Sequence, residues 1–264
     1  MSILFGMPTL IECPEIADSI NLCASLGLGF VELNMNLPVC QLDTMNVEAI
    51  KTQLADNGLF CTIHLDENLN VCDFNAAVAD AYQKTVLDTI AVAKKLAAPV
   101  LTMHMASGVY FTLPDRKIYL FEQYRDLYLE KLSRFRALCD AAIGDSDITI
   151  CIENGGAYKG FQQAGIDVLL QSAHFGLTYD IGHAYSGGLA DEPFVLARQN
   201  KLCHMHIHDA HDGKDHLPLG TGDIDLLRYL TLAEKNDCRC VIETKTVAGL
   251  TQSVAWLKHI NAFV

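Results

Sequence analysis

Acidic and histidine side chains recur near the carboxyl ends of short runs that are rich in β-branched and aliphatic residues. The runs DITICIEN, FGLTYDIG, LCHMHIHDA and CRCVIETK contain, in that order, Glu153, Asp180, His206 and Glu243. Because side chains alternate across a strand, each of these residues lies on the face opposite to its immediate apolar neighbours, which are Ile152, Tyr179, Met205 with Ile207, and Ile242. Converging carboxylates and imidazoles need protons or a cation, since burying uncompensated charge is very expensive. The pattern therefore predicts a divalent metal site.

Further titratable residues fall on the same face of their runs. They are Glu32 in FVELN, His64 in LFCTIHLD, His104 in PVLTMHMA, and His204 and His208 beside His206. Glu32 either orients a metal ligand or is a structural hydrogen-bond partner, and we favour the first role. Neutral imidazole and carboxylate oxygens suit manganese or zinc first, with cobalt, iron or magnesium as further options. We expect one to three ions per chain.

These runs belong to a set of eight that alternate with longer helical stretches, a pattern typical of parallel strands and crossover helices. The expected strands are residues 3–8, 30–34, 59–66, 99–106, 147–154, 175–182, 202–210 and 238–245. A chain of 264 residues gives each unit about 33, which suits a βα repeat. The sequence therefore predicts an α/β fold, with residues 1–264 forming one TIM (β/α)8 barrel domain.

Local signals place the helices and the longest loops. Gly27 is expected to end the first helix, Asp73 or Asn75 to cap the helix that reaches Leu96, and Asp223 to cap the helix after Gly222. Two connections are unusually long, residues 107–117 and 211–222. The loops that follow the strands build the active site of such barrels, so both are candidate lids or substrate loops.

Composition limits the classes of protein to which the chain can belong. Half of the residues are apolar and 19% are charged, which indicates a sizeable core, and the net charge of −13 argues against nonspecific nucleic-acid binding. The ten cysteines are dispersed without a CxxC pair, so we interpret most of them as core residues. The amino-terminal segment lacks the pattern of a secretory signal, and no apolar run reaches about 18 residues, so we expect a cytoplasmic protein without membrane contact.

The sequence resembles the xylose isomerase-like barrel superfamily, which includes sugar epimerases and endonuclease IV (AP endonuclease family 2). The resemblance spans the eight units and rests on TIHLD, LTMHMA, ICIENGG, LTYDIGHA, CHMHIHDA, DGKDHLPLGTGDID and CVIETK. It implies that Glu153, Asp180, His206 and Glu243 hold one divalent ion. It further implies that Glu153 and Glu243 are the catalytic acid/base pair, which transfers a proton through a metal-stabilised enediolate.

The same resemblance leaves a second function open, a zinc phosphodiesterase of endonuclease IV type that acts at abasic sites in DNA. The residues that match its additional metal ligands are His64, His104, His183 and His216. That family has an Asp two residues before the last histidine, where this chain has Lys214, so Asp212 or Asp215 would have to replace it. A third hypothesis is a noncatalytic sugar-binding barrel.

The leading prediction is a metal-dependent isomerase or epimerase of a small sugar, keto-sugar or sugar phosphate. Related epimerases often carry an arginine after the strand-seven histidine, and the stretch HIHDAHDGK has none. His183 and Lys245 are therefore the expected substrate-binding residues. The expected partner is a small-molecule sugar. Nucleic acid is the less favoured partner, and a homo-oligomer is compatible with the sequence.

Overall fold

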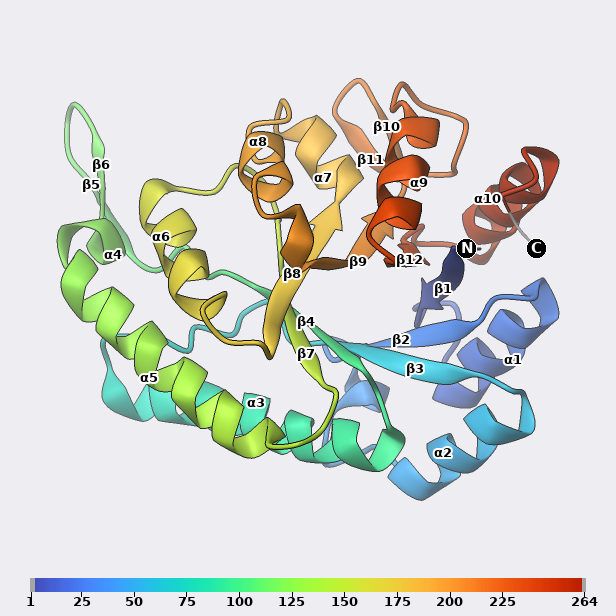
Figure 1. Cartoon of the computed structure of the whole chain (residues 1–264), viewed down its shortest axis with the longest axis horizontal. Helices are drawn as coiled ribbons and strands as arrows, with labels where there is room; N and C mark the ends of the chain where they lie inside the picture. Colours follow the sequence, from blue (N-terminus) through green and yellow to red (C-terminus); the bar gives the residue numbers. More distant parts are fainter. Residues whose placement is uncertain (1–2, 263–264) are drawn as a thin grey trace.

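Eight parallel strands close into a barrel in the computed structural model, which describes residues 3–262 (Figure 1). Neighbouring strands around the barrel follow the order of the chain, with β1 pairing β12 to close it. The strands are β1 (Leu4–Pro8), β2 (Phe30–Asn34), β3 (Phe60–His64), β4 (Val100–His104), β7 (Thr149–Glu153), β8 (Phe175–Asp180), β9 (Leu202–Ile207) and β12 (Arg239–Ile242). All eight expected runs contribute a strand, and the TIM barrel fold class is confirmed.

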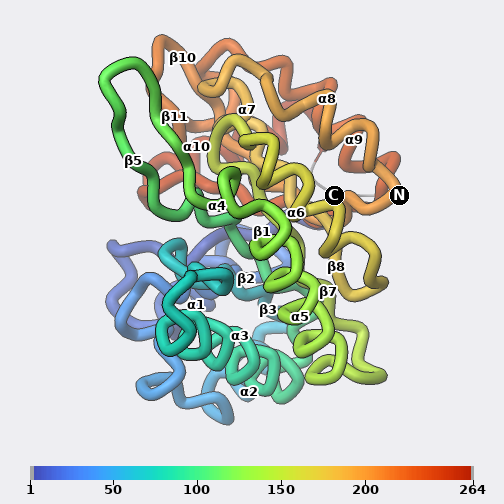
Figure 2. Tube along the Cα trace, turned by 90° about the vertical axis from the view of Figure 1, so that its left-hand side faces the viewer, coloured from blue at the N-terminus to red at the C-terminus, as the bar shows by residue number. Residues whose placement is uncertain are grey.

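Helices surround this barrel (Figure 2). They are α1 (Ile16–Leu26), α2 (Val47–Asp56), α3 (Ala76–Leu96), α4 (Leu120–Gln123), α5 (Arg125–Ile143), α6 (Gly160–Leu169), α7 (Ile181–Ser186), α8 (Glu192–Leu196), α9 (Leu226–Lys235) and α10 (Val247–His259), with 3-10 turns at Pro38–Cys40 and Gln199–Lys201. Their apolar residues recur three or four positions apart, as Ile16, Ile20 and Cys23 do in α1, and bury one face of each helix. No helix of residues 3–262 is both long and apolar enough to cross a membrane.

The helix caps agree with the sequence analysis at two of three places. Gly27 ends α1 in the left-handed region with φ of 78°, and the Asn75 side chain accepts a hydrogen bond from Ala77 N to begin α3. The prediction for α9 was wrong. Its cap is Asp225, whose Oδ1 accepts from Arg228 N, whereas the Asp223 carboxylate lies 2.6 Å from His211 Nδ1.

Several strands end earlier than expected at their carboxyl ends. Ile181 and Gly182 belong to α7 rather than β8, because the Asp180 side chain accepts a hydrogen bond of 2.6 Å from His183 N and starts the helix at once. His208 and Glu243 lie one residue beyond β9 and β12. Their side chains are therefore placed by the loops at the barrel mouth as well as by strand alternation.

Both long connections contain a small antiparallel hairpin that the sequence analysis missed. One consists of β5 (Tyr110–Thr112) and β6 (Lys117–Tyr119), and the other of β10 (Asp209–His211) and β11 (Lys214–Leu217). Both lie toward the top of Figure 1, as does α7, which directly follows β8. The buried Asp209 carboxylate accepts hydrogen bonds from Gly220 N and Gly222 N and so fixes the return of the second hairpin.

The barrel interior combines large side chains with glycines. A Cβ on Gly6 would lie 2.5 Å from the ring of Phe30, which is fully buried. The Phe30 ring stacks on the Phe60 ring, with 5.2 Å between the ring centroids. The ten cysteines are free thiols and eight of them are buried, which confirms their interpretation as core residues. Burial raises the pKa of the Cys61 thiol to about 12.

We expect Gly6→Ala to lower the free energy of unfolding by about 1–3 kcal/mol, because the added methyl overlaps the Phe30 ring. The matched control is Gly160→Ala at the start of α6, where the nearest atom to the new Cβ is 4.0 Å away. Chemical denaturation should show a stability that is unchanged or raised for this control. Equal stability of Gly6→Ala and the unmodified chain would contradict the packing described for β1 and β2.

Candidate metal centre

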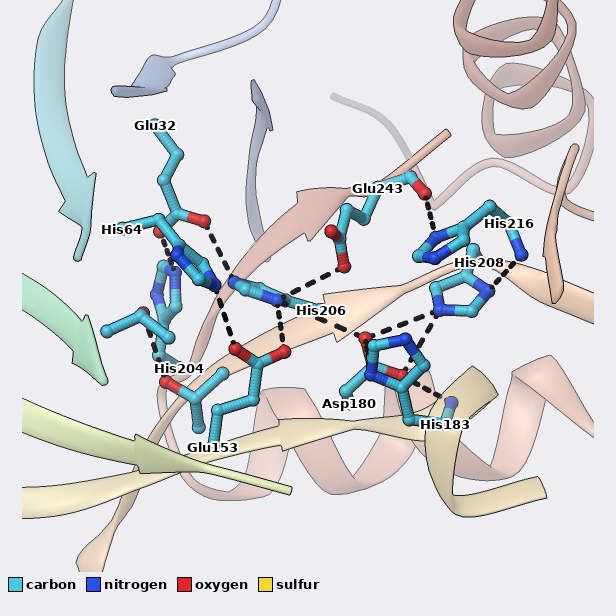
Figure 3. Close-up of polar contacts among 12 residues, drawn as sticks. Glu32, His64, Glu153, Asp180, His183, His204, His206, His208, His216 and Glu243 are labelled. Carbon is cyan, nitrogen blue, oxygen red and sulfur yellow. Dashed lines mark hydrogen bonds and ion pairs between the residues drawn. The ribbon is translucent and has the colours of Figure 1, made fainter. Parts of the chain in front are cut away.

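Four side chains, from β7, β8, β9 and the residue after β12, meet at the carboxyl end of the barrel (Figure 3). They are Glu153, Asp180, His206 and Glu243, and one ligand atom from each lies within 4.8 Å of the others. All four side chains are buried. The structure therefore brings together the whole set that the sequence analysis proposed as metal ligands.

The His206 imidazole lies between carboxylates on both of its sides. Its Nδ1 is 2.7 Å from Glu153 Oε1 and 3.3 Å from Glu243 Oε2, while its Nε2 is 2.9 Å from Glu32 Oε1. Burial by itself would lower the pKa of His206, but the attraction of Glu153, Glu32 and Glu243 outweighs it and holds the pKa well above its usual value. Both nitrogens thus face negative charge, and a divalent cation that replaces the Nδ1 proton would satisfy this donor set.

Glu32 anchors the opposite side of the same imidazole. Its Oε2 accepts a hydrogen bond from Thr62 Oγ1 at 2.9 Å and lies 3.0 Å from His204 Nε2. Burial would raise the pKa of this carboxyl, but the positive charge of His206 and hydrogen bonds with His204 and His206 lower it below the usual range. Glu32 therefore fixes the orientation of the His206 ring from the side opposite to Glu153 and Glu243.

Two further histidines flank the second oxygen of Glu153. His64 Nε2 lies 3.1 Å and His104 Nε2 lies 2.9 Å from Glu153 Oε2. His64 Nδ1 lies 2.8 Å from the Leu65 carbonyl oxygen, which can only accept, so this nitrogen carries the proton. If the His64 ring were neutral, its Nε2 would carry no proton, and the lone pair of this nitrogen would face the Glu153 carboxylate. Burial opposes protonation of His64, yet contact with Glu153 prevails and raises its pKa to about 9.

A third group contains His183, His208 and His216, whose ring nitrogens lie within 4.8 Å of one another. His208 Nδ1 accepts a hydrogen bond of 2.8 Å from His216 N, so its Nε2 carries the proton and lies 3.2 Å from Asp180 Oδ1. His208, which the sequence analysis did not assign to a site, therefore supports Asp180. Strand alternation from His206 was the signal for it.

Asp212 and Asp215, the two residues that could replace the family's aspartate at the position of Lys214, have different surroundings in the structure. Asp215 Oδ2 lies 4.0 Å from His183 Nε2, and Asp215 Oδ1 lies 3.9 Å from His216 Nε2. Asp212 is exposed and its carboxylate lies 2.9 Å from His211 Nε2. Of the two, Asp215 is the residue beside the third histidine group.

A cavity of about 700 Å³ opens above these groups, which is within the range of small-molecule sites. Glu153, Glu243, His183 and Lys245 are among its lining residues, and Lys245 Nζ lies 2.6 Å from Glu243 Oε1. Lys159 also lines it, with its Nζ 3.1 Å from Ser107 Oγ. Sequence reasoning missed Lys159, because it lies in a loop where strand alternation gives no signal.

The fold and these groups define an α/β barrel with a candidate metal centre at its mouth. Residues 20–260 match the family model described as the xylose isomerase-like TIM barrel, and the chain belongs to that family. This finding confirms the resemblance read from the sequence. An uncharacterized protein of Methanocaldococcus jannaschii is 27% identical over 97% of this chain and 88% of its own length.

Solved structures share the fold at low sequence identity. A D-tagatose 3-epimerase-like protein superimposes with a TM-score of 0.79 and 23% identity, over 98% of this chain and 96% of its own. The 3-keto-D-glucoside 4-epimerase of E. coli gives a TM-score of 0.76 and 16% identity, over 97% and 99% of the two chains. The IOLI protein, solved with a binding zinc atom, gives a TM-score of 0.72 and 12% identity, over 100% of this chain and 98% of its own.

The protonated histidines of the centre predict a dependence of stability on pH. Because the pKa of His64 is raised from 6.5 to about 9, its stabilising charge is complete below pH 6.5 and is lost as the pH rises through 9. The melting temperature of the chelated protein should therefore fall over this range, and it should fall less after addition of Mn²⁺ or Zn²⁺. Calorimetry of the unmodified chain and of His64→Asn measures both effects. A chelated unmodified protein with no greater fall than the variant would refute this assignment.

Proposed function

We propose that this protein is a divalent-metal-dependent isomerase or epimerase of a small sugar, keto-sugar or sugar phosphate. The observation that carries the proposal is the His206 ring held between Glu153, Glu243 and Glu32, of which Glu153 and Glu243 also line the open cavity. Membership of the xylose isomerase-like family and the fold shared with sugar epimerases support it.

The four residues Glu153, Asp180, His206 and Glu243 would hold the ion, and mixed nitrogen and oxygen ligands suit manganese or zinc. When bound, a divalent ion supplies polarisation of a substrate carbonyl and its neighbouring hydroxyl. Orphaned buried atoms agree with this assignment. Glu243 Oε2 has no hydrogen-bond partner among the described residues, although it lies 3.3 Å from His206 Nδ1.

Each of the two glutamates divides its oxygens between the ligand group and the cavity. Glu153 Oε1 and Glu243 Oε2 face His206 Nδ1. Glu153 Oε2 lies beside His64 and His104, and Glu243 Oε1 lies beside Lys245, all of which line the cavity. In the proposed reaction, the second oxygen of each carboxylate removes a proton from a substrate carbon or returns one.

Lysines and a histidine are available to position the substrate. Lys245 and His183 line the cavity near the glutamates, and in this proposal they bind the substrate. Lys159 lies at another part of the wall, over the Tyr119 ring at 4.8 Å. An ammonium at either place suits a sugar hydroxyl, and also a phosphate if the substrate carries one.

A zinc phosphodiesterase of endonuclease IV type is the second candidate. The observation in its favour is that His64 and His104 with Glu153, and His183 with His208 and His216, form further groups of metal-ligand size beside the first. Metal-bound hydroxide is the usual nucleophile of such enzymes. The net charge of −13 opposes binding of a DNA duplex.

We expect Glu153→Gln and Glu243→Gln each to lower the rate of proton exchange between substrate and solvent by about 10²–10⁴-fold, because each removes one proton carrier. The readout is deuterium incorporation, measured by NMR over a panel of ketoses and their phosphates with metal-loaded protein. Calorimetry should show folded variants. Absence of exchange by the unmodified protein across the panel would count against the isomerase, and unchanged exchange in both variants would remove the acid/base roles.

The metal content separates the two candidate functions. We expect elemental analysis of protein purified without chelator to give about one ion per chain, because residues 3–262 contain one group of four ligands. An abasic DNA duplex should remain uncut. About three ions per chain together with incision would replace the isomerase by the phosphodiesterase.

A further inference from the structure

Two thiols meet inside the barrel beneath the candidate metal centre. Cys151 Sγ lies 3.0 Å from Cys203 Sγ, although Cys151 is in β7 and Cys203 is in β9. Strand β8 lies between β7 and β9 in the barrel, so the two sulfurs meet across an intervening strand. This contact is not part of the ligand groups described above.

A local irregularity of the sheet produces the contact. The pairing of β8 with β9 shifts register, so that Leu177 pairs with Leu202 and Thr178 with His204, which leaves Cys203 as an extra residue. Strict alternation from His204 would have turned Cys203 outward, and that expectation was wrong at this position. The bulge directs its sulfur toward the interior instead.

The intervening strand leaves room for the pair by lacking a side chain. Gly176 of β8 pairs with Cys151, and a Cβ on it would lie 3.1 Å from Cys203 Sγ and 2.9 Å from the Lys201 carbonyl oxygen. Any larger residue at this position would therefore press on Cys203. The absence of a side chain at Gly176 and the bulge at Cys203 together allow the two sulfurs to come into contact.

The two sulfurs differ in their surroundings. Cys151 is fully buried, whereas Cys203 is partly exposed. The hydrogen bond with Cys151 lowers the pKa of Cys203, and the positive charges of Arg239 and Lys201 lower it further. By contrast, burial raises the pKa of Cys238 to about 12. Cys203 therefore has the partial exposure and the positive surroundings that favour reaction of a cysteine.

We propose that Cys151 and Cys203 are a modification site, a dithiol that a hydroperoxide oxidises to an intramolecular disulfide. The Cys203 thiolate attacks one oxygen of the hydroperoxide, the O–O bond breaks, and the products are a Cys203 sulfenic acid and an alcohol or water. The Cys151 sulfur then attacks the Cys203 sulfur. The S–S bond forms, and the hydroxyl leaves as water with the Cys151 proton. Two electrons pass from the two thiols to the hydroperoxide.

The disulfide would tie together two strands that carry the ligand group. Cys151 precedes Glu153 by two residues, and Cys203 precedes His206 by three. A disulfide has sulfurs about 2.05 Å apart, so the two must approach by about 1 Å from their present separation of 3.0 Å. Oxidation is therefore expected to draw β7 and β9 together below the centre.

The test uses the full-length folded protein and hydrogen peroxide in small molar excess. After oxidation the free thiols are blocked, the chain is digested without reduction, and the peptides are identified by mass. We expect the number of free thiols to fall by two, the dominant linked peptide pair to contain Cys151 and Cys203, and dithiothreitol to restore both thiols. Unchanged thiols, or linkage mainly through other cysteines, would overturn the proposal.

Serine variants assign the two roles and do not depend on the enzymatic function. Cys151→Ser should leave Cys203 to accumulate as a sulfenic acid that dimedone traps, because the resolving thiol is gone. Cys203→Ser should abolish both dimedone labelling and the linked peptide. Cys238→Ser is the matched control, because Cys238 is a buried thiol directly before β12, the other neighbour of β9, and this variant should still form the disulfide. Equal labelling of Cys151→Ser and Cys203→Ser would assign the reactive thiol elsewhere and overturn the proposal.

Discussion

The need to compensate buried negative charge at His206 is the constraint on which the mouth of this barrel depends. Three glutamates reach one imidazole from three strands or strand ends, and none of them is exposed enough for water to screen its charge. Unpaired, such carboxylates would cost several kcal/mol each. Protons on the histidines or a cation between the ligands must offset this cost, so charge balance and site geometry are a single problem here.

The closed barrel brings the charged side chains to one place. Parallel strands end at the same rim, so Glu153, Asp180 and His206 are brought together without a dedicated loop. Glu32 and His204 lie one layer deeper and hold His206 from below. Of the two proposed catalytic residues, Glu153 is oriented by the sheet and Glu243 by the residue that follows β12, while Lys159 and His216 reach the cavity from a loop and a hairpin.

Features that follow from side-chain periodicity were predictable, and features that follow from irregularity were not. The period of two was enough to predict from the sequence that Glu153, His206 and Glu32 face the barrel interior, because each of them lies in a stretch of strand that keeps regular alternation. The bulge at Cys203 breaks that period by one residue, and nothing in the run LCHMHIHDA signals it. The short hairpins were missed because strands of three or four residues carry too little pattern. Asp225 rather than Asp223 caps α9, since Asp223 has a competing partner in His211.

The direct passage from β8 into α7 limits how this barrel can diversify. Asp180 both ends the strand and caps the helix, and a Cβ on Gly182 would lie 1.8 Å from His208 Cε1. Neither an insertion nor a larger side chain fits at this junction without moving Asp180. Diversification of the barrel at this junction would therefore require joint changes at Asp180 and His208, because each of them constrains the other.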